Sequence, residues 1–303
     1  MKILVTGATG FVGREIVRQL HAASHRVRVL VRDPQGRSAR ELIPAFAAES
    51  HAGNVLVAAS LPGAATSCDA IIHLVGLISE FGEQTFENVH RHATQNLLAE
   101  AQRAGVRRWI HMSALGTRPN ARSRYHQTKW AAEEAVRASG LDWTIFRPSL
   151  IYGPGDGFVN LFARISRRSP VLPVMGSGQN LFQPVSVAEV ARCFVGALNE
   201  PASVGKMFDV CGPERLSYDA VLDAVLHATH RRRLKLHVPL PLARLAAAAL
   251  EFLFPVLLRQ APPLNRDQLL MLKEDNVGER EPAAAQFGLT AKPFAEGIAA
   301  YLK

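Results

Sequence analysis

The stretch that decides the fold is Lys2-Ile-Leu-Val-Thr-Gly-Ala-Thr-Gly-Phe-Val-Gly13, an apolar run followed by three glycines spaced three apart. Apolar residues then recur at helical spacing as far as Leu20. Gly7 permits a tight turn, Gly10 lets the backbone approach a pyrophosphate, and Gly13 lets the helix pack closely on the strand. The free amides and the dipole at the helix N-terminus favour an anion. Because the triplet lies between a strand and a helix, it predicts a dinucleotide site.

Strand-like and helix-like segments alternate along the first half of the chain. Short apolar runs bounded by turn residues predict strands, and longer stretches with three- and four-residue spacing predict helices. This alternation implies right-handed crossovers and an α/β fold with a doubly wound parallel sheet of the Rossmann kind. The expected strands are 2–6, 25–32, 70–75, 108–112 and 143–147, and the expected helices are 11–20, 86–104 and 125–138.

The pattern loosens after Pro148 and indicates a second, smaller lobe. Glycines and prolines are frequent there, around one short helix. A helix at 187–198 and a strand near 206–211 are expected to return to the sheet. The predicted division is a dinucleotide-binding domain over 1–150, with 181–211 returning to it, and a mainly helical C-terminal lobe for the substrate over 151–180 and 212–303.

The composition is that of a globular protein. The chain has 303 residues, of which 48% are hydrophobic and 20% charged, so it is long enough to bury a substantial core. Its three cysteines are widely spaced in apolar runs, and we expect buried thiols in a reducing compartment, without disulfides or a metal site. The apolar run at 2–6 reads as a core strand and not as a secretion signal, so we expect a cytoplasmic location.

The net charge of +9 is scattered, apart from Arg231-Arg232-Arg233 with Lys235. No aromatic residues interleave with this basic run. A solvated surface is therefore favoured, and nucleic acid is not expected as a partner.

The stretch Val238–Leu258 is strongly apolar and carries two charges, Arg244 and Glu251. We interpret it as a core-facing helix of the C-terminal lobe. It contains no run of about 18 uncharged apolar residues, so a membrane-spanning helix is not expected. The alternative is an apolar surface that meets a membrane peripherally, or a lipid-like substrate, helped by the basic run before it.

The end of the second expected strand indicates which dinucleotide binds. An NAD site usually has Asp or Glu there, to accept from the ribose 2′-hydroxyl. Val31 occupies the corresponding position, and the guanidinium of Arg32 suits the 2′-phosphate of NADP(H). Asp33 keeps NAD(H) as the alternative, although Asp33-Pro34 reads as a turn beyond the strand.

Ser113, Tyr125 and Lys129 form a pattern suited to carbonyl reduction. Tyr125 and Lys129 are four residues apart on one helical face, and Ser113 follows an apolar strand. Reduction of a carbonyl needs a proton donor at oxygen, and a free tyrosine with a pKa of about 10 ionises reluctantly. A lysine ammonium is expected to lower that pKa and to reach the nicotinamide ribose, while the serine hydroxyl holds the substrate oxygen. His73 and His111 are expected to be packed core side chains.

Together these motifs resemble the short-chain dehydrogenase/reductase superfamily, in its extended and atypical, epimerase/dehydratase-like branch. Cys68–Gly76 is similar to the family's fourth strand, and Gln183–Ala191 to its return element. A narrower likeness, carried by Ser139–Gly153 and Pro263–Leu269, is to bacterial relatives of subunit nine of the respiratory complex I alpha subcomplex. The resemblance implies a cofactor site made of Gly7, Thr9, Gly10, Phe11, Val12, Gly13, Arg32, Asn54, Val55, Leu74, Val75, Gly76, Tyr125, Lys129, Pro148 and Ile151.

Three departures from the family pattern bear on function. Asn54 stands where an Asp is usual, and His90 stands where extended members often carry an Asn. The loop between Ser113 and Tyr125 lacks the usual sugar-nucleotide epimerase phrase, so a nucleotide-sugar substrate is disfavoured.

Two classes of function remain open at this point. The first is an NADP(H)-dependent oxidoreductase for a carbonyl or alcohol of a hydrophobic, quinone- or isoprenoid-like small molecule. The second is a cofactor-binding structural or assembly protein, because in the complex I branch the cofactor is thought to be structural.

Overall fold

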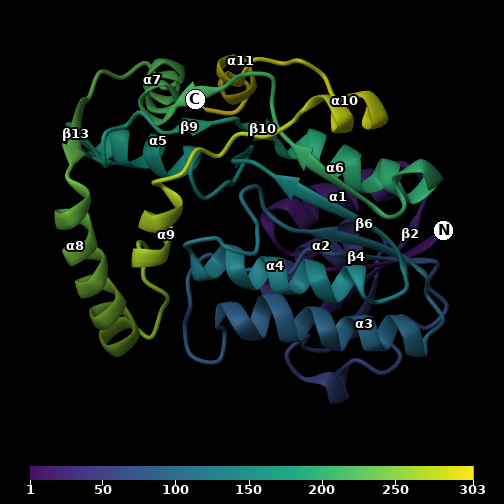
Figure 1. Ribbon diagram of the computed structural model, residues 1–303. Helices are drawn as coiled ribbons and strands as arrows, with labels where there is room; N and C mark the ends of the chain where they lie inside the picture. Colours follow the sequence, from purple (N-terminus) through teal and green to yellow (C-terminus); the bar gives the residue numbers. More distant parts are fainter. Residues whose placement is uncertain (303) are drawn as a thin grey trace.

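A computed structural model describes residues 1–302 of the chain. Its centre is a sheet of seven parallel strands in the order β11-β6-β5-β4-β1-β2-β3 (Figure 1). The doubly wound parallel sheet predicted from the sequence is thereby confirmed. The strands are β1 Lys2–Thr6, β2 Arg26–Val31, β3 Glu49–Ala52, β4 Ala70–His73, β5 Arg108–Met112, β6 Asp142–Pro148 and β11 Lys206–Val210.

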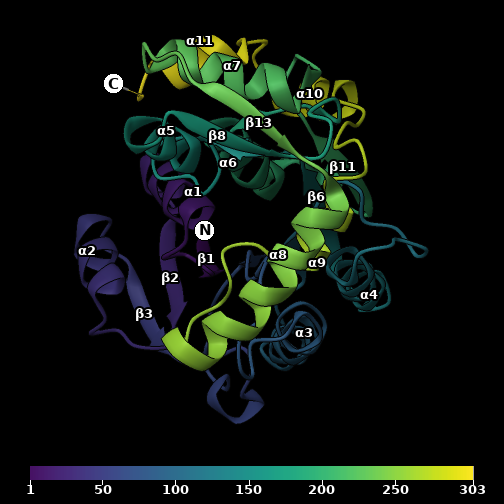
Figure 2. The ribbon, with the colours of Figure 1, turned by 90° about the vertical axis from the view of Figure 1, so that its left-hand side faces the viewer.

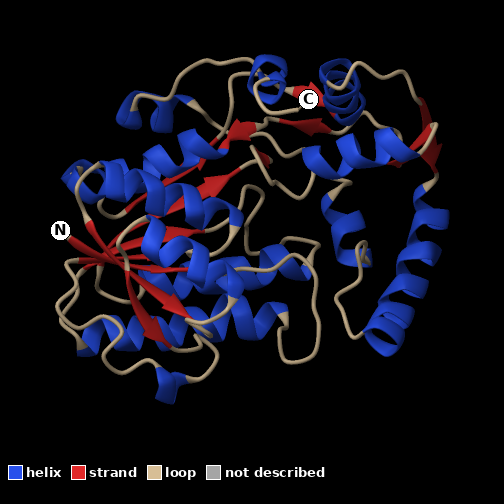
Figure 3. Cartoon of the chain, turned by 180° about the vertical axis from the view of Figure 1, so that it is seen from behind, coloured by secondary structure: helices blue, strands red, loops and turns tan. Residues whose placement is uncertain are grey.

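Helices cover both faces of this sheet, as Figure 1 and the view from behind in Figure 3 show. One face carries α1 (Phe11–Ala22) and α6 (Val187–Gly196), which pack on each other. The other carries α3 (Ala93–Arg103), preceded by a π-helical turn at Glu87–His92, and α4 (Arg124–Arg137). The apolar core therefore forms two clusters, one on each face.

The strand order reverses beside β1, which pairs with β2 on one side and with β4 on the other. From β1 the chain crosses over to β2 on one side, and from β4 it crosses over to β5 on the other side. The two crossovers therefore run in opposite directions from the middle of the sheet. A crevice at the carboxyl ends of the strands is where open α/β sheets bind ligands. The fold thus places the glycine triplet, the end of β4 and the end of β5 along one edge.

Two regular elements of this domain carried too weak a signal to be predicted. They are α2 (Arg37–Ala45), which has Pro44 inside it, and β3, whose Glu-Ser-His-Ala sequence is largely polar. The strand pairs through its backbone with β2 at the edge of the sheet, and Glu49 adds ion pairs to Lys2 at 2.6 Å and to Arg28 at 2.9 Å.

Most of the remaining elements build the C-terminal lobe, while β10 and α10 contribute to the apolar cluster on the α1 and α6 face of the sheet. A third apolar cluster joins α5, α7 and α11. The segment after residue 212 is mainly helical, as expected, and within it β13 pairs in parallel with β8. The elements are β7 Ile151–Tyr152, α5 Val159–Arg168, β8 Val171–Met175, β9 Leu181–Phe182, β10 Val185–Ser186, β12 Leu216–Ser217, α7 Tyr218–Ala228, β13 Leu234–Val238, α8 Leu240–Leu253, α9 Arg266–Met271, α10 Glu281–Phe287 and α11 Phe294–Ala299.

The interpretation of 238–258 as a core-facing helix was wrong. Helix α8 continues through a π-helical turn to Leu258, and only Ala243 and Ala247 of it are buried. The 19-residue stretch Leu240–Leu258 also meets the length and composition of a membrane-crossing helix, which the charge of Arg244 and Glu251 had seemed to exclude. Packing against α9 covers one narrow face and leaves the rest of the apolar surface uncovered.

Gly13 sets how closely α1 approaches β1. A Cβ on Gly13 would collide with the Gly7 carbonyl oxygen and would lie 2.7 Å from the Ala8 Cα. Both obstacles are backbone atoms, which cannot rotate away, so the helix would have to move.

We predict that Gly13→Ala lowers the free energy of unfolding by about 3 kcal/mol or more, because overpacking against rigid backbone forces the helix off the sheet. Urea unfolding followed by circular dichroism measures this. Gly157→Ala is the matched control, because a Cβ there would meet no described atom within 4 Å. Equal stability of the two variants would show that α1 is not packed at this distance.

Candidate active site

The glycine triplet forms an anion-binding turn at the start of α1. Gly7 has φ of +74°, which glycine adopts without strain, and its carbonyl accepts from Gly10 N–H at 3.0 Å. Gly10 is the N-cap of α1 and offers no side-chain acceptor to the first N–H groups of the helix. A Cβ on Gly10 would meet one described atom within 4 Å, the Gly7 oxygen at 3.2 Å, so the outer side of the turn is open. These features fit the pyrophosphate of a dinucleotide.

Arg32 follows the last residue of β2 and is exposed. Asp33 starts the turn before α2, as expected, since its Oδ1 accepts from Gln35 N–H at 2.8 Å. Two further guanidiniums stand nearby in the fold, on the first turns of α1 and α2. Arg14 and Arg37 both pair with Glu41, at 3.2 and 3.1 Å. The end of β2 therefore presents the guanidinium of Arg32. Val31, the last residue of the strand, offers no carboxylate to a ribose 2′-hydroxyl.

The loops after β3, β4 and β6, expected beside the adenine and the nicotinamide, also lie at the carboxyl ends of the strands. Asn54 Oδ1 accepts from Leu56 N–H at 3.0 Å and so shapes the loop after β3, in which Val55 is buried. After β4, Leu74 is buried, Val75 is half-buried and Gly76 is exposed. At the end of β6, Pro148 is buried and Ile151 of β7 is half-buried.

Lys129 buries its ammonium at the carboxyl ends of β4 and β5. The residue is 2% exposed, and its Nζ donates to the Met112 carbonyl oxygen at 3.0 Å. A Cβ on Gly76 would lie 3.1 Å from Nζ, so glycine is what leaves this face of the ammonium open. Burial lowers the pKa of Lys129 to about 8, against a smaller opposing effect of Glu133. The lysine is still mostly charged at neutral pH.

Tyr125 lies one turn before Lys129 on α4 and is half-buried. Its ring packs edge-on against His90 and Phe86, with centroid distances of 5.1 and 5.9 Å. Burial raises the pKa of Tyr125 to about 12, so the lowering expected from Lys129 is not present. The reason is geometric, because the ammonium bonds the Met112 carbonyl instead of the phenol. The tyrosine is therefore fully protonated at neutral pH.

Ser113 follows β5 directly and is 3% exposed. Its backbone N–H donates to the Phe146 carbonyl, and its Oγ donates to Thr117 Oγ1 at 3.4 Å. No hydrogen bond within residues 1–302 joins Ser113 to Tyr125. The residue adjoins Met112, whose carbonyl accepts from Lys129, so Ser113 and Lys129 meet at the end of β5, and Tyr125 lies one helical turn before Lys129 on α4.

His90 connects two segments of the candidate site. From the sequence it was recognised only as a departure from the family pattern. Its Nδ1 lies 2.9 Å from Thr128 Oγ1, and its Nε2 lies 3.1 Å from the Leu77 carbonyl oxygen. Burial holds the pKa of His90 well below its usual range, and the nearby charge of Lys129 is the second-largest cause. A neutral imidazole thus ties the segment after β4 to the helix that carries Tyr125.

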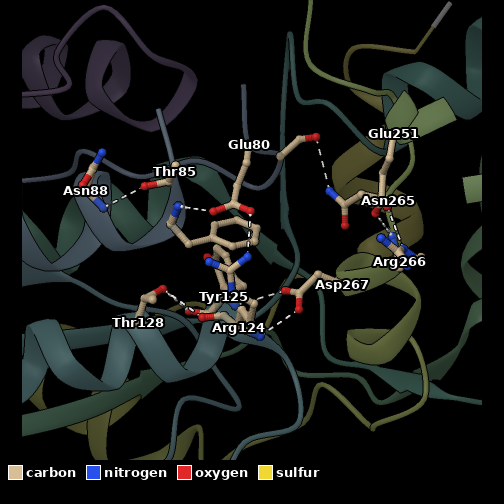
Figure 4. Close-up of polar contacts among 12 residues, drawn as sticks. Glu80, Thr85, Asn88, Arg124, Tyr125, Thr128, Glu251, Asn265, Arg266 and Asp267 are labelled. Atoms are coloured by element: carbon tan, nitrogen blue, oxygen red, sulfur yellow. Dashed lines mark hydrogen bonds and ion pairs between the residues drawn. The ribbon is translucent and has the colours of Figure 1, made fainter. Parts of the chain in front are cut away.

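Asp267 of α9 is a site residue whose role the sequence did not reveal. Its carboxylate accepts from Arg124 N–H at 2.7 Å and from Tyr125 N–H at 3.0 Å, at the first turn of α4 (Figure 4). Carboxylates stabilise helix N-termini because the first N–H groups lack partners and the dipole is positive there. Arg124 in turn pairs with Glu80 at 3.1 Å. The C-terminal lobe therefore holds the first turn of the helix that carries Tyr125 and Lys129.

Two further buried histidines, His73 and His111, are structural. Hydrogen bonds to Thr6 at 2.7 Å and Thr94 at 3.2 Å satisfy His73, and burial lowers the pKa of His73 to about 3. His111 is buried against His73, and both of its ring nitrogens lack a hydrogen-bond partner in the described chain. Neither imidazole can act as a base at neutral pH. This agrees with the expectation that both are packed core side chains. The three cysteines are free and buried, as predicted.

Sequence comparison places the chain in a known family. Residues 7–201 match the family described as NAD(P)H-binding, which covers the glycine turn, Tyr125 and Lys129. The chain therefore belongs to this NAD(P)H-binding family.

Curated relatives share the fold over long stretches. A mitochondrial NADH dehydrogenase [ubiquinone] 1 alpha subcomplex subunit 9 from Arabidopsis thaliana is 29% identical over 90% of this chain and 70% of its own length. A ceramide reductase from Caulobacter vibrioides is 38% identical over 57% of this chain and 53% of its own length. Sterol demethylase protein B from Methylococcus capsulatus is 28% identical over 99% of this chain and 98% of its own length.

Solved structures agree on the architecture. A dTDP-glucose 4,6-dehydratase from Streptomyces venezuelae with NAD bound has a TM-score of 0.76 at 21% identity, covering all of this chain and 96% of that one. The UDP-glucose 4-epimerase of Thermus thermophilus with NAD has the same TM-score at 22% identity, covering all of this chain and 98% of its own. At such identities the likeness concerns the fold alone.

We predict that Lys129→Met stabilises the ligand-free protein at pH 7 by roughly 1–3 kcal/mol. Lowering the pKa from 10.5 to about 8 corresponds to about 3 kcal/mol of unfavourable burial, from which the lost hydrogen bond subtracts about 1 kcal/mol. The ammonium disfavours folding below pH 8, and this effect fades as pH rises toward 10.5. In the parent, the free energy of unfolding should therefore rise from pH 8 to 10, and in the variant this rise should be absent.

The same substitution should abolish most dinucleotide binding, because Lys129 is assigned to the nicotinamide ribose. Urea unfolding across pH and calorimetric titration with NADPH measure the two effects. Lys292→Met, at an exposed lysine, is the matched control and should change neither. A less stable Lys129→Met protein at pH 7, or one that binds NADPH as the parent does, would contradict the assignment.

Proposed function

We propose that this protein is an NADP(H)-dependent oxidoreductase that interconverts a carbonyl and an alcohol. The observation that carries the proposal is the buried Lys129 ammonium beside Ser113 and one helical turn from Tyr125, at the carboxyl end of β5. A structural protein gains nothing from burying an unpaired lysine charge, which is costly. An oxidoreductase gains a cation beside the proton donor.

The chemistry divides between the cofactor and this chain. When bound, the nicotinamide supplies or accepts the hydride at the substrate carbon. Tyr125 is protonated, and its hydroxyl makes no hydrogen bond within residues 1–302, so it is free to donate to the carbonyl oxygen. Ser113 would orient that oxygen, and the Lys129 cation would stabilise the phenolate left behind. Hydride plus proton convert the carbonyl to an alcohol, and solvent returns a proton to Tyr125.

Two features support NADP(H) over NAD(H) as the cofactor. Val31 offers no carboxylate to the ribose 2′-hydroxyl, and Arg32 is exposed at the end of β2 with no ion pair to an acidic residue of the described chain. A dianionic 2′-phosphate suits this guanidinium.

An apolar substrate is favoured by the relatives and by the loop after β4. Two relatives carry the names ceramide reductase and sterol demethylase protein B. Ile78 is 52% exposed on the loop that His90 holds beside Tyr125. We therefore propose a hydrophobic alcohol or carbonyl, of the lipid, quinone or isoprenoid class.

A second candidate is a cofactor-binding structural role. It is favoured by the extent of the match to the complex I subunit, over 90% of this chain, and by a Tyr125 pKa that is raised and not lowered. In that case the dinucleotide would stabilise the fold without turnover.

We predict that NADPH binds more tightly than NADH and that Arg32→Ala removes most of the difference. Losing one charge-assisted contact to phosphate costs about 1.5–3 kcal/mol, or roughly 10- to 100-fold in affinity. Calorimetric titration of parent and variant with both dinucleotides tests this. Arg40→Ala, an exposed arginine on α2, is the control. Equal affinities of the parent for the two dinucleotides would refute the choice of cofactor.

We predict that Tyr125→Phe lowers turnover at least about 100-fold while NADPH affinity changes little, since only the proton donor is lost. Complementation of a deletion strain separates the two candidate functions. Gly10→Val, which places a β-branched side chain where the pyrophosphate approaches, serves as the cofactor-deficient comparison. If Tyr125→Phe complements fully and Gly10→Val does not, the structural candidate replaces the enzyme.

A further inference from the structure

Helix α8 projects from the C-terminal lobe with most of its apolar surface uncovered. In Figure 2, which faces the left-hand side of Figure 1, α8 and β13 cross the front of the molecule. Residues Leu245 and Phe252 are each 70% exposed. A predominantly apolar helix is normally enclosed by a protein core or by lipid. This one is enclosed by neither within the described chain.

The exposed residues fall on one face of the helix. We call Leu242, Leu245, Ala249, Phe252 and Val256 the apolar stripe. Their spacing of three, four, three and four residues aligns them along the side away from Ala243 and Ala247, which pack on α9. Exposed Leu234 and Leu236 of β13 extend the same apolar surface. A continuous apolar patch of this kind marks an interaction surface.

Positive charge surrounds the stripe. The segment 230–266 contains seven lysines and arginines but one acidic residue, Glu251, which pairs with Arg266 at 2.7 Å. The residues that make no ion pair within the described chain lie before β13, on α8 and just after the helical stretch; they are Arg231, Arg232, Arg233, Arg244 and Arg259. Apolar side chains flanked by guanidiniums complement a layer of acyl chains beneath anionic headgroups.

The stripe fits the surface of a bilayer better than its interior. Seven residues, 259–265, connect the end of the helical stretch to α9. Fully extended they reach about 25 Å, less than the roughly 30 Å of hydrocarbon that a return would cross. An extended return would also leave its backbone polar groups unpaired in lipid. Packing of α8 on α9 further keeps the helix beside the lobe.

We propose that the apolar stripe docks this protein peripherally on an anionic lipid bilayer, with α8 lying in the interface and its arginines on the headgroups. The docked helix is close to the candidate active site. Helix α9 lies between α8 and α4 (Figure 1), packs on α8 through Leu269 and holds the first turn of α4 through Asp267. Tyr125 therefore lies one helix away from the membrane, where an apolar substrate would be dissolved.

Vesicle co-sedimentation with the full chain tests the docking. One vesicle is phosphatidylcholine alone, and the other is an equal mixture of phosphatidylcholine and phosphatidylglycerol. We expect binding to the mixed vesicles, weak binding to the neutral ones, and at least about a tenfold loss of affinity in Leu245→Glu/Phe252→Glu, which puts two charges among the acyl chains. The control is Val204→Glu/Met207→Glu, which makes the same change at exposed apolar residues on the opposite end of the sheet and should bind as the parent does.

Further measurements separate a loss of docking from unfolding, from a failure of the enzyme proposal and from dimer formation. Both double variants should retain the thermal shift with NADPH, which shows that they fold. Tyr125→Phe should bind vesicles as the parent does, so a failure of the enzyme proposal stays separate from a failure of docking. Parent protein that ignores both vesicles, or a stripe variant that still binds, overturns the proposal. So does light scattering that shows a parent dimer which the stripe variant splits, because a second copy would then cover α8.

Discussion

The fold depends on the contact between the backbone of α1 and the end of β1. With no side chain at Gly13, the first turn of the helix rests on the Gly7 carbonyl and the Ala8 backbone. This approach directs the free N–H groups of α1 at the carboxyl edge of the sheet, next to the strands that carry the remaining site residues. A larger residue would separate the anion site from the Lys129 site. The cofactor site that the glycine triplet predicts depends on this one spacing.

The buried ammonium of Lys129 is the second constraint, and it works against stability. Burial lowers its pKa to about 8, and one carbonyl hydrogen bond offsets only part of that cost. Neutral His90 and protonated Tyr125 surround it without neutralising it. A protein keeps such a residue where it serves a ligand. The lobe that carries Asp267 then holds the tyrosine helix in place across a sequence separation of 142 residues.

Much of this could be predicted from the sequence because the relevant signals are local. The glycine spacing, the apolar strands and the Tyr125–Lys129 interval each lie within a few residues, and all were found in the structure as expected. What could not be predicted depends on distant contacts. Strand β3 forms by pairing with β2 and by the ion pairs of Glu49 with β1 and β2, and the role of Asp267 requires α9 to meet α4. Helix α8 is exposed because most of its surface is not packed against other elements of the described chain. The periodicity of the helix's own sequence cannot show this.

The central claim is that the edge between the glycine turn and Lys129 holds one dinucleotide with its nicotinamide beside Tyr125. A crystal structure of the protein with NADPH tests it most directly. The account predicts the pyrophosphate on the N–H groups of Phe11 and Val12, the 2′-phosphate beside Arg32, and the Lys129 ammonium on the nicotinamide ribose. NADPH bound elsewhere, or bound with its nicotinamide directed away from Ser113 and Tyr125, would contradict the account.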